Sequence, residues 1–357
     1  MTRDQRLVHD SGLNSGTWPI ATPSHFITPV ERFFTRSHAP VPTIDPSTWR
    51  LEVDGLVRRP AQFSLEELIA EFPRRTVDVT LVCAGLRRAE FLAIGPLPGE
   101  LPWGPEPVST GTWAGVALDD LLREVGVEAG AQYVEFTGLD RVEREGHRFG
   151  FGGSIDLDKA MSGEVLLATE LNSAPLPPMH GYPLRSVVPG WIGARSVKWL
   201  GRITLLAEPS ANYFQSQAYR TQRKADPERP RDVSSGDALG EVPLNAIIAE
   251  PADGAVVPAG GVTVRGWAMG SAGRPLISVE VSSNGGRDWY QASITMPGTA
   301  WTWSLWEAPL RLEPGPHVLA VRATDRAGIT QPAELSETWN VKGYANNAWH
   351  RVAIVAE

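Results

Sequence analysis

The chain has 357 residues, of which 42% are hydrophobic and 21% are charged, and this usage excludes a disordered or fibrous protein. Its 41 acidic and 33 basic side chains give a net charge of −8, so we expect no general electrostatic binding to nucleic acid or to an anionic membrane. The length exceeds the roughly 100–200 residues of one typical domain and indicates two domains.

The single cysteine, Cys83, excludes an internal disulfide, and no CxxC or HxxxH spacing indicates a structural zinc site. The first 20 residues lack the basic start and apolar run of a signal peptide. No apolar run approaches the ~20 residues of a membrane helix. We therefore expect a cytoplasmic protein, and a periplasmic location stays open if a leader has been removed.

The predicted elements are mostly strands, because 35 glycines and 30 prolines separate short runs rich in Val, Ile, Thr and Trp. Residues 64–67, Ser-Leu-Glu-Glu, have the form of a capping box and predict the start of a helix. Residues 76–83 alternate and predict a strand whose apolar parity includes Cys83. A second helix is predicted over 118–122, ending near Gly126.

The composition changes over residues 220–240, which are crowded with charged residues, Ser and Pro and predict a linker. We place the boundary there, which gives domains over 1–230 and 231–357. Five strand-like runs follow, over 261–269, 277–283, 288–294, 302–306 and 317–324. Their spacing predicts an immunoglobulin-like sandwich without paired cysteines.

A cationic stretch over residues 180–202 carries Arg185, Arg195, Lys198 and Arg202 but no carboxylate. Two unit charges 4 Å apart interact by ~4 kcal/mol at an effective dielectric constant near 20, so convergent cations could hold a phosphate. The alternative is a solvated basic loop. Charge alone does not decide between them.

Cys83 ends the predicted strand and is followed by Arg87 and Arg88. Nearby arginines favour a thiolate, the form needed for nucleophilic attack and for binding a soft metal. The alternative is a buried small hydrophobe, which a lone cysteine more often is. A second cationic cluster, with Arg36 and His38, lies over residues 33–38.

Several motifs occur in order at fitting spacing. They cover residues 34–38 (Phe-Thr-Arg-Ser-His), 80–85 (Thr-Leu-Val-Cys-Ala-Gly), 138–140, 151–155, 180–185, 188–190, 193–200 and 347–352. On these motifs the chain resembles the sulfite oxidase family of molybdenum enzymes over nearly its whole length. The resemblance implies an α+β domain that binds molybdenum-molybdopterin, followed by an immunoglobulin-like dimerisation domain. Only about 40 residues precede the first motif, so we expect no haem module and an external electron acceptor of unknown identity.

The resemblance also implies roles for individual residues by motif position. Cys83 is the implied thiolate ligand of molybdenum. The residues implied to contact the pterin and its phosphate are His38, Asp140, His180, Arg185, Ser196, Val197 and Lys198. The residues implied near the substrate are Arg36, Arg88, Trp103 and Tyr219, where arginines attract an oxyanion and a tyrosine hydroxyl can form a hydrogen bond.

Three departures from the family pattern bear on the substrate. Leu86 and Ser37 stand where asparagine is common, and Lys342 stands in the motif over 339–343 where animal enzymes have arginine. We expect Lys342 to reach back to a pocket formed by Arg36 and Arg88. Lysine keeps the charge but lacks the two-pronged geometry of arginine. The alternative is a lysine solvated on the sandwich surface.

The favoured function is oxidation of sulfite to sulfate by oxygen-atom transfer. An alternative on the same cofactor is reduction of a sulfoxide, nitrate or another oxyanion, and an alternative of another class is a non-catalytic two-domain binding protein. The expected partners are a small oxyanion and a second copy of the chain. Seven of the 13 tryptophans lie in the C-terminal half, and we expect an obligate dimer interface of roughly 2,000 Å² or more.

Overall fold

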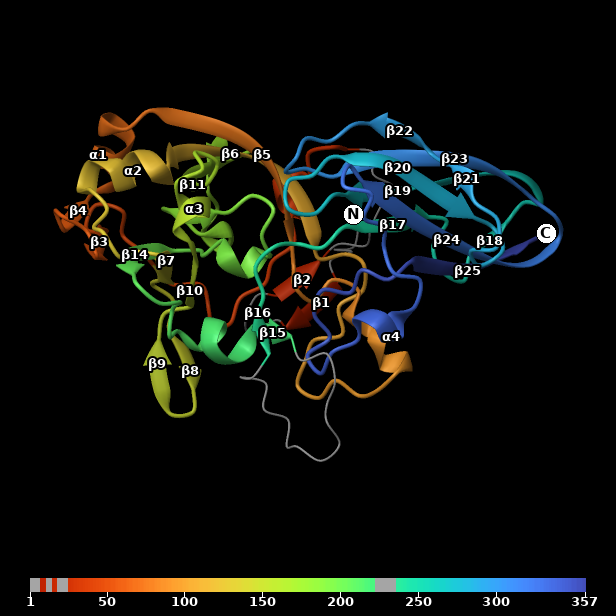
Figure 1. The fold of residues 1–357 in the computed structure, drawn as a ribbon, viewed down its shortest axis with the longest axis horizontal. Coiled ribbons are helices and arrows are strands. Elements are labelled where there is room, and N and C mark those ends of the chain that lie inside the picture. The colour runs from red at the N-terminus through yellow and green to blue at the C-terminus, as the bar shows by residue number, and fades with distance from the viewer. Residues whose placement is uncertain (1–6, 11–14, 18–24, 222–235) are drawn as a thin grey trace, which may run out of the picture.

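The computed structural model describes residues 7–10, 15–17, 25–221 and 236–357. They form two parts that lie side by side, with the N-terminal part on the left of Figure 1 and a blue and cyan sandwich on the right. None of the helices in the described ranges is long and apolar enough to cross a membrane.

The first domain contains a five-stranded mixed sheet. Its strands, in spatial order, are β10 (Gly152–Asp156), β7 (Tyr133–Gly138), β14 (Leu200–Leu206), β3 (Leu51–Gly55) and β4 (Ala61–Phe63). Strands β14 and β3 are parallel, and the other neighbours are antiparallel. The pattern is typical of an α+β domain, which confirms the expected class.

A second sheet lies beside it and is antiparallel. Its strands are β12 (Ala174–Pro175), β11 (Leu166–Leu171), β6 (Val108–Ala117) and β5 (Arg74–Val82), and β13 (Arg185–Val187) also pairs with β11. Smaller two-stranded ribbons are β1 (Leu7–Asp10) with β2 (Ser15–Thr17), β8 (Val142–Arg144) with β9 (His147–Phe149), and β15 (Arg220–Thr221) with β16 (Asp237–Ala238).

Helices are few and short, as predicted. The α-helices are α1 (Leu65–Glu71), α2 (Leu118–Val125), α3 (Leu157–Ala160) and α4 (Leu335–Thr338). Short 3₁₀-helices occur at Val30–Arg32, Arg88–Ala93, Pro178–His180 and Gly193–Arg195, and a π-helix occurs at Phe214–Ala218. The capping box is confirmed, because Ser64 Oγ accepts from the Glu67 N–H at 3.1 Å and the Glu67 carboxylate accepts from the Ser64 N–H at 2.7 Å. Helix α2 ends at Gly126, also as predicted.

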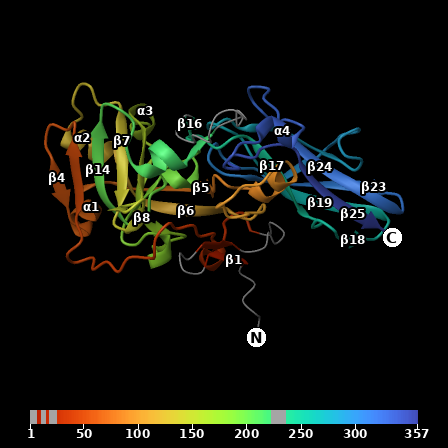
Figure 2. The same ribbon diagram turned by 90° about the horizontal axis from the view of Figure 1, so that it is seen from below.

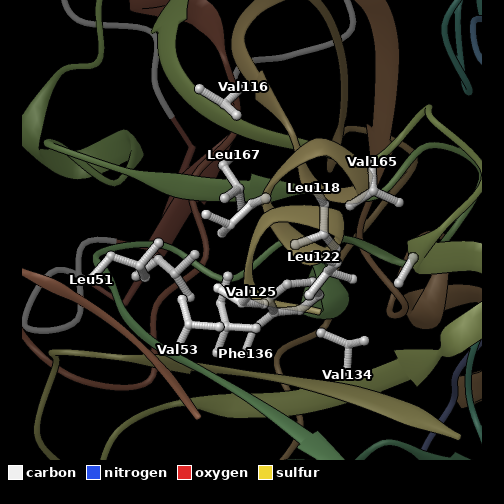
Figure 3. Close-up of a cluster of buried hydrophobic side chains, with 14 of the residues drawn as sticks. Leu51, Val53, Val116, Leu118, Leu122, Val125, Val134, Phe136, Val165 and Leu167 are labelled. Atoms are coloured by element: carbon white, nitrogen blue, oxygen red, sulfur yellow. The ribbon is translucent and has the colours of Figure 1, made fainter. Parts of the chain in front are cut away.

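The core of the first domain forms where α2 packs against β3 and β7. Figure 3 shows Leu118 and Leu122 of α2 among side chains of these strands, including Val53 and Phe136. All four side chains are at most 1% exposed. This apolar layer fixes the sheet from which the motif at Asp140 emerges.

The second domain is a β-sandwich, as predicted. One sheet has the order β17 (Asn245–Glu250), β19 (Gly260–Met269), β23 (Ser304–Leu312) and β22 (Ser293–Met296). The other has the order β18 (Val256–Val257), β25 (His350–Ala356), β24 (Gly315–Asp325), β20 (Leu276–Ser282) and β21 (Tyr290–Gln291). The run predicted over 288–294 is divided between β21 and β22, and the motif over 347–352 leads into β25.

The tryptophans of the second domain mainly build its core and its contact with the first domain. Trp267 and Trp306 are each 1% exposed. Trp301 packs against Gly190 of the first domain, where a Cβ would lie 2.6 Å from the indole, and under the Lys159 ammonium at 4.1 Å. Glycine at position 190, with φ of +78°, permits this close approach. The tryptophan enrichment is therefore no marker of a dimer surface.

Strands β5 and β6 extend from the first domain toward the sandwich in both views (Figures 1 and 2). The predicted alternation in β5 disappears at this end, because Val79, Thr80, Leu81 and Val82 are all buried. The Thr80 N–H donates to the Trp301 carbonyl at 2.9 Å, and Thr80 Oγ1 accepts from the N–H of Trp303 at 2.9 Å. Both faces of β5 are covered at this end, because the second domain packs against the strand just before Cys83.

The predicted linker begins at β15 and ends beyond β16. Its middle, including the proposed boundary at 230/231, lies outside the described residues. The boundary therefore stays a prediction.

Candidate functional site

A cavity of about 70 Å³ lies in the first domain at the end of β5. It is lined by nine of the residues that the sequence singled out, namely Arg36, His38, Cys83, Asp140, His180, Arg185, Ser196, Lys198 and Tyr219. These residues come from five separate segments of the chain. The fold therefore brings the two cationic clusters and the cysteine to one place.

Four predicted residues do not line this cavity. The Val197 side chain is fully buried in the hydrophobic core, its N–H donates to Ser186 Oγ at 2.7 Å, and its carbonyl accepts from the Ser186 N–H at 2.9 Å. Arg88, Trp103 and Lys342 form a neighbouring group that is described below.

Two cations of the cavity wall are bonded to uncharged groups. Arg185, 5% exposed, donates to the His180 carbonyl at 2.9 Å and to the Ser196 carbonyl at 3.0 Å, and its guanidinium lies 4.8 Å from the centre of the Trp113 ring. Lys198 Nζ donates to Ser37 Oγ at 2.7 Å. In the described part of the chain, no carboxylate lies within ion-pair distance of either cation. Uncompensated buried cations of this kind favour an anionic ligand.

Burial also shows in the pKa values of these cations. It lowers the pKa of Arg185 to about 9. It lowers the pKa of Lys198 to about 7, with repulsion from Arg185 adding to the shift and Asp140 opposing it. An anion bound here would favour the charged form of both groups.

The other two cations of the 180–202 stretch do not converge on the cavity. Arg195 is fully buried behind the wall and donates to the carbonyls of Phe214 and Leu239, at 3.2 and 3.1 Å. Arg202 lies on β14 and pairs with Asp54 of β3 at the exposed face of the sheet. Of the four cations in this stretch, Arg185 and Lys198 line the cavity, whereas a turn at Arg195 and a strand at Arg202 direct those two side chains elsewhere.

Asp140 and Ser196 organise the backbone around the cavity. Asp140 Oδ1 accepts from the Phe151 N–H at 2.9 Å, and burial raises the pKa of this carboxyl against the effect of that hydrogen bond and of Lys198. Ser196 Oγ accepts from the Val188 N–H at 3.0 Å. The two side chains hold together loops that meet at the cavity.

On the opposite side His38 connects Arg36 with Tyr219. The His38 ring is stacked on Phe151 with 5.3 Å between centroids, and its Nε2 lies 2.9 Å from the Tyr219 hydroxyl oxygen. Burial lowers the pKa of His38 well below its usual value, and the charge of Arg36 adds to this shift. Burial also raises the pKa of Tyr219 to about 12. At neutral pH the ring is uncharged and the hydroxyl keeps its proton.

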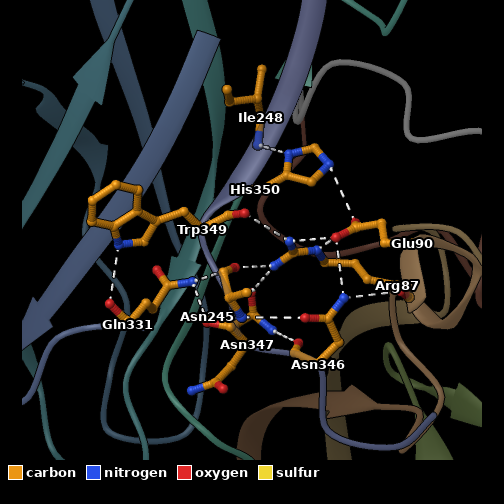
Figure 4. A network of polar contacts seen from close by, with 10 residues as sticks. Arg87, Glu90, Asn245, Ile248, Gln331, Asn346, Asn347, Trp349 and His350 are labelled. Atoms are coloured by element: carbon orange, nitrogen blue, oxygen red, sulfur yellow. Dashed lines mark hydrogen bonds and ion pairs between the residues drawn. The ribbon is translucent and has the colours of Figure 1, made fainter. Parts of the chain in front are cut away.

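The arginines that follow Cys83 do not bring the pKa of its thiol below the usual value. Figure 4 shows Arg87 in a network with Glu90, Asn245 and Asn346. Burial raises the pKa of the Cys83 thiol, and the opposing effect of Arg88 and Arg36 is smaller. The neighbouring charges alone do not produce a thiolate, so a positively charged metal would have to stabilise it.

Arg88 and Trp103 lie close together beyond the cavity. A Cβ at Gly85 would come within 2.8 Å of the Arg88 guanidinium carbon and 2.9 Å of the Trp103 ring, so only glycine fits between them. The Arg88 guanidinium lies 4.9 Å from the centre of the Tyr344 ring, and this ring is stacked on Tyr219 at 5.4 Å. Arg88 therefore lies beside the part of the cavity wall that Tyr219 forms.

Lys342 reaches this group through a carboxylate. Its Nζ lies 2.9 Å from Glu100 Oε1, and Glu100 Oε2 lies 3.3 Å from Arg88 Nη1. The Lys342 side chain is 28% exposed, so it is not solvated on the sandwich surface. Glu100 and Tyr344 were missed by sequence reasoning. Only Tyr344 had a signal, since it directly follows the motif over 339–343.

The donors present fit molybdopterin. The cavity offers one thiol to a soft metal, and a buried and a half-buried cation to a phosphate, and these chemistries match the two ends of that cofactor. The uncharged His38 stacked on Phe151 provides an aromatic wall between them. This combination supports the cofactor implied by the resemblance.

Comparison with known proteins agrees with this assignment. Residues 38–214 match the model of the oxidoreductase molybdopterin binding domain, and residues 237–357 match that of the Mo-co oxidoreductase dimerisation domain. Sulfite oxidase from Gallus gallus is 39% identical over 91% of this chain and 72% of its own length. Sulfite oxidase, mitochondrial, from Homo sapiens is 39% identical over 94% of this chain, which spans 63% of that protein.

Two further relatives widen the comparison. The nitrate reductase [NAD(P)H] of Hordeum vulgare is 37% identical over 92% of this chain and 39% of its own length. The crystal structure of the sulfane dehydrogenase SoxCD from Paracoccus pantotrophus superposes with a TM-score of 0.83 and 25% identity, covering 99% of this chain and 90% of that chain. The motifs, the cavity and these matches agree, and the chain belongs to the sulfite oxidase family of molybdopterin-dependent oxidoreductases.

Proposed function

We propose that this molybdopterin-dependent oxidoreductase oxidises sulfite to sulfate. The observation that carries the proposal is the cavity beside Cys83, where Arg36, Arg185 and Lys198 have no carboxylate partner among the described residues. The similarity to sulfite oxidases supports the choice of substrate. Sulfite and one water give sulfate, two protons and two electrons, so an acceptor outside the cavity must take the electrons.

The bound cofactor would supply a metal that accepts two electrons during oxygen-atom transfer. Cys83 would bind the metal through its sulfur. Arg185 and Lys198 would bind the phosphate, since the first is a buried and the second a half-buried cation and neither pairs with a carboxylate among the described residues. The remaining contacts to the pterin would come from His38, Asp140, His180 and Ser196.

The substrate would be held at the end of the cavity near Tyr219. The Tyr219 hydroxyl keeps its proton because burial raises its pKa to about 12, so it can donate a hydrogen bond to an oxyanion. Arg36 would contribute positive charge beside it. Arg88, Trp103 and Lys342 would complete this end through their contacts around Tyr344.

Reduction of nitrate is the second candidate, and the similarity to nitrate reductases favours it. The two reactions run in opposite redox directions. Nitrate would take two electrons from the reduced site, whereas sulfite would give two. The family assignment removes the non-catalytic binding protein from the alternatives.

Purified enzyme with measured molybdenum content tests the proposal. We expect sulfite to reduce an artificial one-electron acceptor such as ferricyanide, with a stoichiometry of two acceptors per sulfite. With a reduced dye as donor, nitrate and methionine sulfoxide should be turned over far more slowly. Fast nitrate reduction without sulfite oxidation would contradict the proposal.

We also propose that the second domain forms a homodimer. The matched dimerisation model supports this, as do apolar side chains on the sandwich that are 38% to 63% exposed, such as Val256, Ile277, Tyr290 and Val355. Light scattering should give about twice the chain mass of 38.8 kDa. A species of 38.8 kDa alone at micromolar concentration would contradict the dimer.

The cytoplasmic location stays a prediction from the sequence. Cell fractionation with the full-length natural protein would test it. Recovery in the periplasm would contradict it.

A further inference from the structure

Glu100 joins two cations that sequence reasoning assigned to the substrate. Its Oε1 lies 2.9 Å from Lys342 Nζ and its Oε2 lies 3.3 Å from Arg88 Nη1. The Glu100 side chain is 16% exposed, and that of Arg88 is 5% exposed. Each oxygen of the Glu100 carboxylate therefore pairs with one cation, in a region that is largely shielded from water.

Glu100 is connected with the cavity through Arg88. The Arg88 guanidinium lies 4.9 Å from the centre of the Tyr344 ring, and this ring is stacked on Tyr219 of the cavity wall. Burial is the main cause that raises the pKa of Tyr219, and the charge of Glu100 contributes in the same direction. Arg88 is also fixed by donating to the Gly343 and Leu101 carbonyls, at 3.3 and 3.1 Å, so its guanidinium cannot move away to release Glu100.

The cations at this end of the site differ in whether a carboxylate already pairs with them. Arg36 donates to the Ser37 carbonyl and to Ser15 Oγ and has no carboxylate within ion-pair distance in the described part of the chain. Arg88 and Lys342 share one negative charge. An oxyanion that approaches Arg88 is repelled by the Glu100 carboxylate, which already pairs with Arg88.

We propose that Glu100 is a specificity-determining residue that competes with the substrate oxyanion for Arg88 and Lys342. The proposal deepens the proposed function and rests on it. The Glu100 carboxylate weakens the binding of any dianion at this end, substrate and product alike. Release of a dianionic product is thereby favoured, and only an anion that also gains contacts deeper in the cavity is retained.

Sulfate binding to the molybdenum-loaded enzyme tests this without turnover. Calorimetry at constant ionic strength should show that Glu100→Gln binds sulfate about five- to thirtyfold more tightly than the parent enzyme, as expected for removal of one charge near the ligand. Glu100→Asp, which keeps the charge, should bind sulfate like the parent. Unchanged or weaker binding by Glu100→Gln would overturn the proposal, because Glu100 would then be inert or would position the cations for the substrate.

Glu106→Gln provides a matched control from the same segment. Burial raises the pKa of the Glu106 carboxyl, and within the described residues it pairs with no cation. The variant should leave sulfate affinity unchanged. An equal gain in Glu106→Gln and Glu100→Gln would overturn the proposal, since the effect would then follow from overall charge.

Lys342→Met should change sulfate affinity in the opposite direction from Glu100→Gln. It should weaken sulfate binding, because Glu100 then acts on Arg88 alone. The double variant Glu100→Gln/Lys342→Met removes a neutral pair and should return to within about threefold of the parent affinity. A double variant that binds as weakly as Lys342→Met would overturn the proposal, because removal of Glu100 would have relieved nothing.

The outcomes separate this inference from the proposed function. Tighter sulfate binding by a Glu100→Gln enzyme that does not oxidise sulfite would contradict only the proposed reaction. Sulfite oxidation with unchanged sulfate affinity would contradict only the inference about Glu100.

Discussion

Two buried arginines of this protein, Arg87 and Arg185, have opposite surroundings. Arg87 donates to both oxygens of Glu90 at 2.7 Å, to Asn245 Oδ1 at 3.1 Å and to the Ala348 carbonyl at 2.7 Å. Arg185 donates to backbone carbonyls and has no carboxylate partner in the described part of the chain. A compensated cation stabilises the contact between the domains, whereas an uncompensated one is prepared for a ligand.

The largest expected effect is at Cys83, beside the uncompensated cations. Cys83→Ser should abolish turnover and leave the fold and pterin binding largely intact, because a hard oxygen replaces a soft sulfur at the metal. Steady-state assay, molybdenum analysis and assay of the released pterin would measure this. Unchanged activity in the metal-loaded variant would make Cys83 a core-packing residue.

The comparison itself is tested by Arg87→Met and Arg185→Met. Arg87→Met leaves Glu90 without its main partner and should destabilise the protein by about 3 kcal/mol, which lowers the melting temperature by roughly 5 °C or more. Arg185→Met should change the melting temperature of the cofactor-free protein little and reduce molybdopterin content to about a tenth or less. If Arg185→Met retains the cofactor fully, the idea of a prepared anion site fails.

The pH dependence of stability gives a smaller effect. Because burial lowers the pKa of Lys198 to about 7 in the fold, the unfolded chain binds more protons than the folded chain between pH 7 and about 10. Stability of the cofactor-free protein should therefore rise with pH through this window, and the rise should be smaller in Lys198→Met. Parallel melting curves for the two proteins from pH 7 to 9 would show that Lys198 is not desolvated.

The smallest expected effect is at Lys342, which is partly compensated by Glu100. Lys342→Ala should raise the KM for sulfite about three- to tenfold, and Lys342→Arg should keep the charge and restore two-pronged geometry. Steady-state kinetics would measure both. Identical constants in all three proteins would place Lys342 outside the substrate pocket.

The sequence predicted well what is encoded locally. The capping box at Ser64 and the end of α2 at Gly126 each depend on residues within one turn of a helix. The family motifs likewise contain eight of the nine predicted residues that line one cavity, and Tyr219 lies outside them. In both cases the information lies in short segments of the chain.

Contacts between distant residues could not be predicted in this way. Glu100 and Lys342 are 242 positions apart, and nothing in either segment indicates the other. Arg185 and Arg202 are near in sequence and point to different sides, since the direction of each side chain depends on its strand and that strand's neighbours. The charge at a site is therefore set by pairing in three dimensions.

The hydrogen bonds between Thr80 and the segment of Trp301 and Trp303 have a consequence for how this protein could be divided. Strand β5, which leads to Cys83, pairs with β6 of the first domain, and the second domain covers its end. A fragment that ends at residue 221 would lack the second domain, so the end of β5 at Thr80 would be exposed to water. The position of Cys83, three residues further along the chain, would then be less well fixed. The C-terminal sandwich is thus an integral part of the metal site's scaffold, and the two halves are not separable modules.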